Sequence, residues 1–317
     1  MAYVSPMPLR FSAALTFVYA LGYPIGALAV SAMPPMVVLV FRFGLAALIL
    51  GVWAGLAGVT WPTRMTLVHV LVSGLLSQGV LFVALYVALE HGAPAVLGAV
   101  VISMNPVVTA VLGALFLGEA LTFLRVVALM VGVAAVLAAC ATRLLAVGGI
   151  DSVMWLLVAA LAGIAAGGVY QQRFCADVDF RASATLQNAA CVAPVVVLAS
   201  LASVTVHNPW HAAAAVAAVV LLNATLSMTM YVRAINVYGA ASVSMLFCVI
   251  PAVAGLLSWL MLGQRPDVGT AVGLVLGAAA CWLSARASGR QKRQHDPADD
   301  GRRQHRVDAV HQASVSG

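Results

Sequence analysis

Long apolar runs, separated by short breaks rich in proline, glycine and polar residues, fill the chain from about residue 10 to residue 286. A helix needs about 20 mostly apolar residues to cross the hydrocarbon core of a membrane, and the runs have this length. The pattern therefore predicts an all-α integral membrane protein with ten transmembrane helices. The predicted helices cover residues 11–30, 36–57, 66–88, 94–116, 122–142, 153–173, 183–204, 211–233, 239–262 and 267–286.

The same pattern occurs twice along the chain, with an offset of 145 residues. Each copy holds an apolar run broken near its middle by proline, then a Leu-Gly stop, then another apolar run. Each half has five helices, an odd number, so the second half enters the membrane from the opposite side and the repeats are predicted to be inverted. The matches least open to coincidence are Pro106 with Pro251, Gly118 with Gly263 and Gly132 with Gly277.

The repeat divides the chain into four parts. We expect a first five-helix repeat in residues 1–143, a connecting loop in 144–152 and a second five-helix repeat in 153–286. Residues 287–317 lose the apolar pattern and are expected to form a disordered basic tail. Lysine and arginine are more frequent on the side of the membrane that holds both termini, so both termini are predicted to be cytoplasmic.

Composition leaves little room for a water-soluble fold. Hydrophobic residues make up 63% of the chain and charged residues 8%, whereas soluble domains have roughly 45–50% and about 25%. The net charge of +6 does not indicate a nucleic-acid partner, because the basic residues lie in short loops and in the tail. The five cysteines are scattered in apolar runs without CxxC spacing, so no metal and no cofactor is predicted.

Several motifs within the predicted helices resemble those of the drug/metabolite transporter superfamily, in its EamA-type branch. They are the arginine of Phe41-Arg42-Phe43, the pair Asn105-Pro106, the Leu117-Gly118-Glu119 stop, Pro251 and Leu262-Gly263. The resemblance covers about residues 10–286, and it departs from the family pattern at Gln264, where the family usually repeats the glutamate. It implies a ten-helix carrier that moves metabolites or drugs across a membrane, usually outward.

Two amides occupy matching positions near the middle of predicted helices. Gln78 lies in the third helix, and the offset of 145 residues places it on Asn223 in the eighth. An unpaired polar group in the bilayer core costs several kcal/mol, so such residues need a partner or a function. They are our first candidates for solute binding, and the alternative is that each amide only bonds to a neighbouring helix.

Arg42 is the charged residue placed furthest inside an apolar run, about 10 Å from Pro35 at ~1.5 Å per residue. The offset pairs it with Gln187. An arginine at this depth costs at least about 2.5–3.5 kcal/mol on insertion scales, so it should face a cavity, a carbonyl or an acid. A guanidinium there suits an anionic or carboxylated solute. The alternative is a structural anchor, or a side chain that snorkels to the outer interface.

Weaker candidates come from polar, aromatic and helix-breaking residues within the runs. For the aromatic residues at helix ends, such as Tyr86, a place in an interfacial belt is the alternative; for the prolines, the alternative is a bend without contact to solute. The further binding candidates are Asn105, Gln187, Tyr19, Tyr23, Tyr86, Tyr170 and Gln171. The candidate hinges are Pro24, Pro106, Pro251, Gly167 and Gly168.

The acidic residues bear on the energy source. Glu119 opens the fifth predicted helix, where a carboxylate suits the helix dipole, and a structural role is favoured. Glu90 and His91 end the third helix and are the candidates for proton coupling. No carboxylate lies at the middle of a predicted helix, so we expect exchange or weak proton coupling rather than a buried-acid pump.

These features together predict a secondary transporter, not an enzyme, that works by alternating access between the repeats, with export as the expected direction. The alternatives are a membrane-embedded enzyme or a non-transporting scaffold, but His-Glu-x-x-His, Gly-x-Ser-x-Gly and the phosphate-binding Gly-x-x-x-x-Gly-Lys loop do not occur. The expected partners are a small-molecule solute and the lipid bilayer. The expected location is a bacterial inner (plasma) membrane.

Overall fold

The computed structural model describes residues 7–117, 123–147, 152–201, 209–265 and 267–294. Every regular element in these ranges is helical. The first half contains α1 (Leu9–Ala32), α2 (Pro35–Leu56), α3 (Arg64–Gly74), η1 (Leu75–Val80), α4 (Leu81–Glu90), α5 (Ala95–Ile102), α6 (Asn105–Leu117) and α7 (Phe123–Val147). The second contains α8 (Ser152–Phe174), α9 (Phe180–Ser200), α10 (Pro209–Ala218), η2 (Val219–Ser227), α11 (Met228–Tyr238), α12 (Ala240–Ser244), η3 (Met245–Cys248), α13 (Ile250–Leu262) and α14 (Val268–Gln294).

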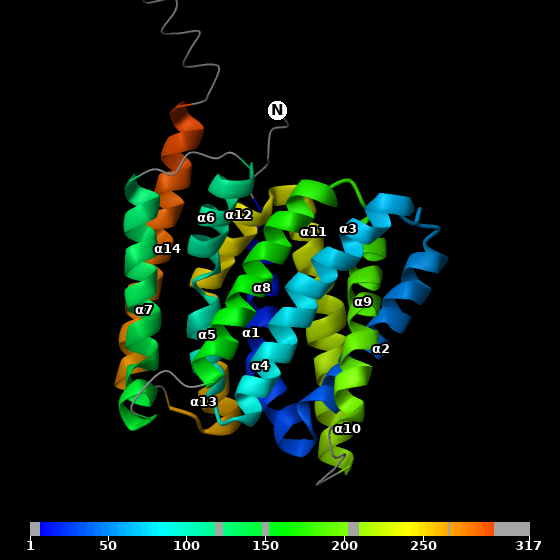
Figure 1. Cartoon of the computed structure of the whole chain (residues 1–317), viewed down its shortest axis with the longest axis horizontal. Coiled ribbons are helices and arrows are strands. Elements are labelled where there is room, and N and C mark those ends of the chain that lie inside the picture. The colour runs from blue at the N-terminus through cyan, green and yellow to red at the C-terminus, as the bar shows by residue number, and fades with distance from the viewer. Residues whose placement is uncertain (1–6, 118–122, 148–151, 202–208, 266, 295–317) are drawn as a thin grey trace, which may run out of the picture.

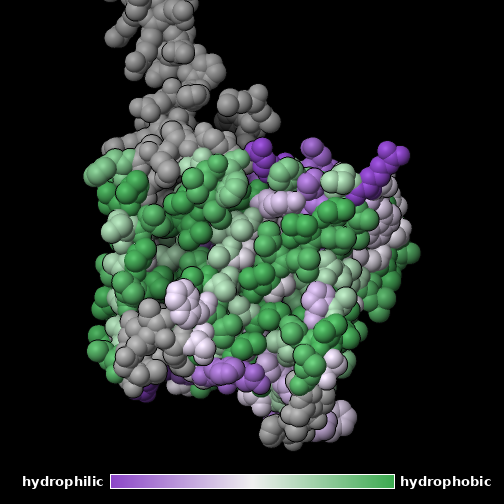
Figure 2. Space-filling model, viewed as in Figure 1, coloured by the Kyte–Doolittle hydropathy of each residue, from purple (hydrophilic) through white to green (hydrophobic). Residues whose placement is uncertain are grey.

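Apolar helices long enough to cross a membrane make up most of the bundle. Seven meet this criterion among the described residues, or eight if the bent pair Ser242–Cys248 and Ile250–Leu262 is one span. Two shorter apolar helices, Val126–Ala139 and Val268–Leu283, lie below it. Figure 2 shows an apolar surface between polar residues at both ends of the bundle, and all six tryptophans are exposed, as lipid-facing and interfacial residues are. The prediction of an all-helical membrane protein is confirmed. The number of helices that meet the length and apolarity criterion is seven or eight, fewer than the ten predicted.

The helices run side by side, and α7 and α14 form a pair at one edge of the bundle (Figure 1). Inside the bundle, α8 packs on η1 and α4, and α2 packs on α9. Glycines allow the closest of these approaches: a Cβ on Gly167 of α8 would lie 2.6 Å from the backbone nitrogen of Ser77 in η1. The close contact of α8 with η1 therefore depends on a residue without a side chain.

Prolines mark matching interruptions in the two halves. Pro106 is the second residue of α6 and Pro251 the second of α13, and each of these helices follows a break. The chain bends by 42° between Ser242–Cys248 and Ile250–Leu262. Proline has no N–H to donate, so it is accommodated in the first turn of the new helix, where that N–H would have no partner.

Glutamine side chains cover the first amides of both interrupted spans. The Ala95 N–H of α5 donates to Gln264 Oε1 at 3.3 Å, and the Ala240 N–H of α12 donates to Gln172 Oε1 at 2.8 Å. Ala95 and Ala240 are 145 residues apart, so the two capped amides are at equivalent places in the halves, although both glutamines belong to the second half. Gln264, the position that departs from the family pattern, is thus a helix cap in this chain.

Three expectations change or fall outside the described residues. The disordered tail was expected from residue 287, but α14 continues to Gln294, because Ala287 to Gln294 are mostly good helix formers and basic residues suit the C-terminal end of a helix. Neither α1 at Pro24 nor α8 at Gly167 and Gly168 is interrupted. Gly118-Glu119, residues 148–151 of the connecting loop and the tail from residue 295 lie outside the described ranges.

We expect Gly167→Ala to lower the stability of the folded protein by about 1–3 kcal/mol, because the added methyl group would meet the backbone of Ser77. Gly55→Ala is the matched control, since a Cβ on Gly55 of α2 meets nothing within 4 Å and alanine is the better helix former. Thermal unfolding of the two purified variants, followed as loss of the monodisperse peak, measures the difference. Equal melting temperatures would contradict the close packing of α8 on η1.

Candidate functional site

The side chain of Arg42 lies entirely inside the bundle. It is the eighth residue of α2, and 0% of its surface is exposed. The interpretation that Arg42 snorkels to the outer interface is therefore wrong. Because a guanidinium cannot lose its charge at ordinary pH, the fold must provide polar partners for it in this apolar environment.

Those partners are the two matched amides. Arg42 Nη1 donates to Gln78 Oε1 at 3.4 Å, and Arg42 Nη2 donates to Asn223 Oδ1 at 3.0 Å. Gln78 and Asn223 are both buried. One guanidinium from the first half thus joins an amide of its own half to the equivalent amide of the other half. Hydrogen bonds to a charged group are about twice as strong as neutral ones, so this contact ties the halves together.

Both amides sit in π-helical segments, which the sequence did not predict. Gln78 lies in η1 and Asn223 in η2, and residues 75–80 and 220–225 correspond under the 145-residue offset. A π-helical turn inserts an extra residue into the helix and changes the direction of the side chains around it, and such turns are frequent at functional sites. The regular α-helix is therefore distorted at equivalent positions of the two repeats, and these positions carry the two amides.

Aromatic rings surround the guanidinium. The Arg42 Cζ lies 3.4 Å from the ring centroid of Phe82 and 4.9 Å from that of Phe43, and such stacking is favourable for a desolvated cation. Sequence reasoning missed both rings as site residues. The signal was present for Phe82, which is four residues after Gln78 and therefore on the same helix face.

Tyr19, from α1, extends this aromatic surface to the second half. Its ring centroid is 5.0 Å from Phe247 of η3 and 6.0 Å from Tyr231 of α11. Tyr23 is buried one turn after Tyr19. Tyr86 is also buried, and it lies beside Arg42, so the alternative that Tyr86 belongs to an interfacial belt is wrong.

Four polar groups at this site have no hydrogen-bond partner in the described part of the chain. They are Arg42 Nε, Gln78 Nε2 and the hydroxyl groups of Tyr19 and Tyr86. Most buried polar groups in folded proteins are paired, so four such groups around one cation require an explanation. All four are able to donate a hydrogen bond.

Two of the predicted binding residues, Gln171 and Gln187, belong to a second polar cluster and do not bond to Arg42. Gln187 Nε2 donates to Gln171 Oε1 at 2.8 Å, and Gln171 Nε2 donates to Asn236 Oδ1 at 3.0 Å. Ser73 and Ser183 bond to the same Gln171. Because these groups satisfy one another, the cluster links α3, α8, α9 and α11 and has the character of structural packing.

The other predicted site residues lie apart from Arg42 or near the ends of the bundle. Asn105 is buried and accepts from Thr109 at 3.0 Å. Tyr170 bonds to His69 at 2.8 Å and lines a cavity of about 450 Å³. Glu90 and His91 are exposed at the end of α4, and Glu90 lines another cavity, of about 500 Å³, with Gln264 and Arg265.

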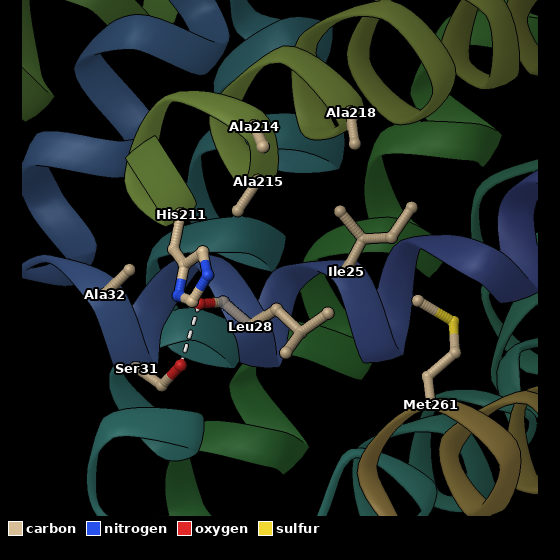
Figure 3. A pocket seen from close by; sticks show the side chains of 9 residues that line it. All are labelled: Ile25, Leu28, Ser31, Ala32, His211, Ala214, Ala215, Ala218 and Met261. Carbon is tan, nitrogen blue, oxygen red and sulfur yellow. Dashed lines mark hydrogen bonds between the residues drawn. The ribbon is translucent and has the colours of Figure 1, made fainter. Parts of the chain in front are cut away.

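A third cavity, of about 610 Å³, opens between α1, α10 and α13 (Figure 3). Ile25, Leu28 and Met261 give it an apolar lining, and the hydroxyl of Ser31 donates back to the carbonyl of Leu28 at 2.8 Å. Its lining includes none of the binding residues that the sequence predicted. The unpaired polar groups described above lie around Arg42 and not in this cavity, so we take the surroundings of Arg42 as the candidate site.

Comparison with known families supplies the identity. The model of the EamA-like transporter family matches residues 9–140 and 152–286, which is most of the chain. The chain belongs to the EamA-like transporter family. As an EamA-like transporter it carries two copies of the family unit, one in each half, in agreement with the resemblance seen in the sequence.

Solved structures support the fold of this EamA-like transporter. Matches include a structure named only "Crystal structure of protein", at 19% sequence identity and a TM-score of 0.64, which covers 87% of this chain and 98% of that chain. At that identity the likeness concerns the fold alone. No curated protein sequence matches.

We expect Gln171→Leu to destabilise the transporter without changing what the Arg42 site binds. The substitution leaves Gln187, Ser73 and Asn236 with one partner fewer, and each buried group left unpaired costs about 1–3 kcal/mol. Thermal unfolding with and without a bound solute separates the two effects: the melting temperature should fall, while the solute-induced rise should persist. Loss of that rise at unchanged stability would place Gln171 in the binding site.

Proposed function

We propose that this EamA-like transporter is a secondary carrier that moves a small solute by alternating access through the site at Arg42. The observation that carries the proposal is the contact of one buried guanidinium with matched amides of both halves. A site shared by two repeats is exposed to one side or the other when the repeats move against each other. Members of this family are transporters, and no feature of the site favours an enzyme or a scaffold.

The proposal includes ten spans arranged as inverted repeats. The seven long apolar helices, the bent pair and the two shorter apolar helices together supply ten. Matching features 145 residues apart support the equivalence of the halves: the π-helical segments, Pro106 and Pro251, and the capped Ala95 and Ala240. An odd number of spans in each repeat makes the second enter from the opposite side.

The orientation of the chain in the membrane follows from its charge distribution. We propose that both termini are cytoplasmic, because arginine and lysine are concentrated on that side and in the tail. We also propose a bacterial inner membrane and export of a metabolite or drug, because the family that the chain resembles consists mostly of outward carriers. The carrier works by exchange or weak proton coupling, because the described carboxylates, such as Glu90 and Asp179, lie at helix ends and not beside Arg42.

Counterflow of labelled solute in proteoliposomes tests the carrier function. We expect Gln78→Leu and Asn223→Leu each to abolish exchange while the protein remains in the membrane, because each change removes a partner of Arg42. Gln171→Leu is the matched control, since it removes a buried amide that does not reach Arg42. Measured per folded protein, its exchange should continue, as should that of Glu90→Gln.

Undiminished exchange by both Gln78→Leu and Asn223→Leu would exclude the Arg42 site from the transport path. Chemical conversion of the solute would exclude the carrier function itself. A pH gradient that alone drives concentrative uptake, lost in Glu90→Gln, would replace exchange by proton coupling.

A further inference from the structure

The positive charge of Arg42 has no negative partner among the residues that the structure describes. The sequence contains ten acidic residues, and all lie in loops, at the ends of apolar runs or in the tail. The described groups around the guanidinium include no carboxylate: they are two amides, two aromatic rings and the side chains of Tyr19, Tyr86 and Cys191. A desolvated charge is stabilised best by an opposite charge with matching hydrogen-bond geometry. The site lacks one anionic group.

The unpaired groups specify what that anionic group is. Arg42 Nε, Gln78 Nε2 and the Tyr86 hydroxyl each offer a hydrogen to a ligand, while the amide oxygens of Gln78 and Asn223 already accept from Arg42. Such a site favours a ligand group that only accepts. A carboxylate has this character and carries one charge, which equals the single positive charge. An amine would add a second positive charge, and a phosphate dianion would leave a negative excess.

The surroundings specify the rest of the ligand. Phe82 and Phe43 lie on the guanidinium. Tyr19 is also close to Arg42, and its ring packs on Tyr231 and Phe247 of the second half. Aromatic surfaces bind apolar groups and stack on other rings. A bare inorganic anion would leave these aromatic surfaces without a contact. A carboxylate with an apolar body contacts both the polar groups around Arg42 and the aromatic rings.

We infer that the solute carried by this transporter is an organic monocarboxylate with an apolar, preferably aromatic body, whose carboxylate binds Arg42, Gln78 and Tyr86. The inference rests on the proposed carrier function and names the solute class. Arg42 supplies charge and one hydrogen bond, and Gln78 and Tyr86 supply the others. The rings hold the apolar body.

Benzoate and its neutral isostere benzamide provide a matched pair of probes. With the purified full-length protein in nanodiscs, we expect benzoate to raise the melting temperature in a concentration-dependent manner and benzamide to have little effect. Arg42→Gln should weaken benzoate binding by roughly 10- to 100-fold, the usual loss for a hydrogen bond to a charged group. Arg233→Gln removes an exposed arginine and should bind benzoate as the natural protein does.

Tyr86→Phe gives an independent test that does not alter the charge. The hydroxyl lies beside Arg42 but makes no well-aligned hydrogen bond within the described part of the chain, so its removal should change the melting temperature of the free protein little. Benzoate binding should nevertheless weaken several-fold. A purely structural Tyr86 would give the opposite result: lower stability and unchanged binding.

Three results would overturn the inference: equal protection by benzoate and benzamide, an unchanged preference for benzoate in Arg42→Gln, or protection by sodium chloride at the concentrations at which benzoate acts. Failure of the carrier function is distinguishable. A protein that exchanges neutral or cationic solutes but is not protected by benzoate is a carrier with another solute. A protein that binds benzoate through Arg42 but exchanges nothing is not a carrier.

Discussion

A positive charge held inside an apolar bundle is the constraint on which the rest of this structure depends. The guanidinium of Arg42 is fully buried and bonds to Gln78 in one half and to Asn223 in the other. Because the side chain is not exposed to solvent, polar groups from several helices must stabilise its charge. The two π-helical segments carry the amides that do this.

The backbone accommodates the charge at equivalent places in both halves. The π-helical turns of η1 and η2 carry the two amides, and Gly22 of α1 leaves the space that the Asn223 side chain occupies. Gly26, one turn later, faces Tyr86 in the same way. The site is therefore built from small residues and irregular turns as much as from the groups that bind, which is the usual design of binding sites between membrane helices.

Much of the fold was readable from the sequence because lipid imposes a simple rule of length and apolarity on each helix. The pairing of Gln78 with Asn223 also followed from the repeat, and so did the breaks before Pro106 and Pro251. Gln187 is equivalent to Arg42 under the offset and was predicted to bind solute for that reason. It bonds to Gln171 instead, because equivalence in a repeat does not fix where a long side chain points. The π-helical turns and the ring of Phe247 escaped prediction, since they depend on contacts between helices far apart in sequence, whereas Phe82 was missed although its spacing from Gln78 was visible.

The central claim, that the surroundings of Arg42 are reached in turn from both sides of the membrane, has a natural probe in Cys191. This thiol is 1% exposed and close to Arg42. In a variant with Cys140, Cys175, Cys248 and Cys281 replaced by alanine, labelling by a membrane-impermeant anionic methanethiosulfonate is measured from each side. The account predicts that Cys191 reacts from either side, and more slowly when an exchanged solute is present. Reaction from one side only, or from neither, would contradict it.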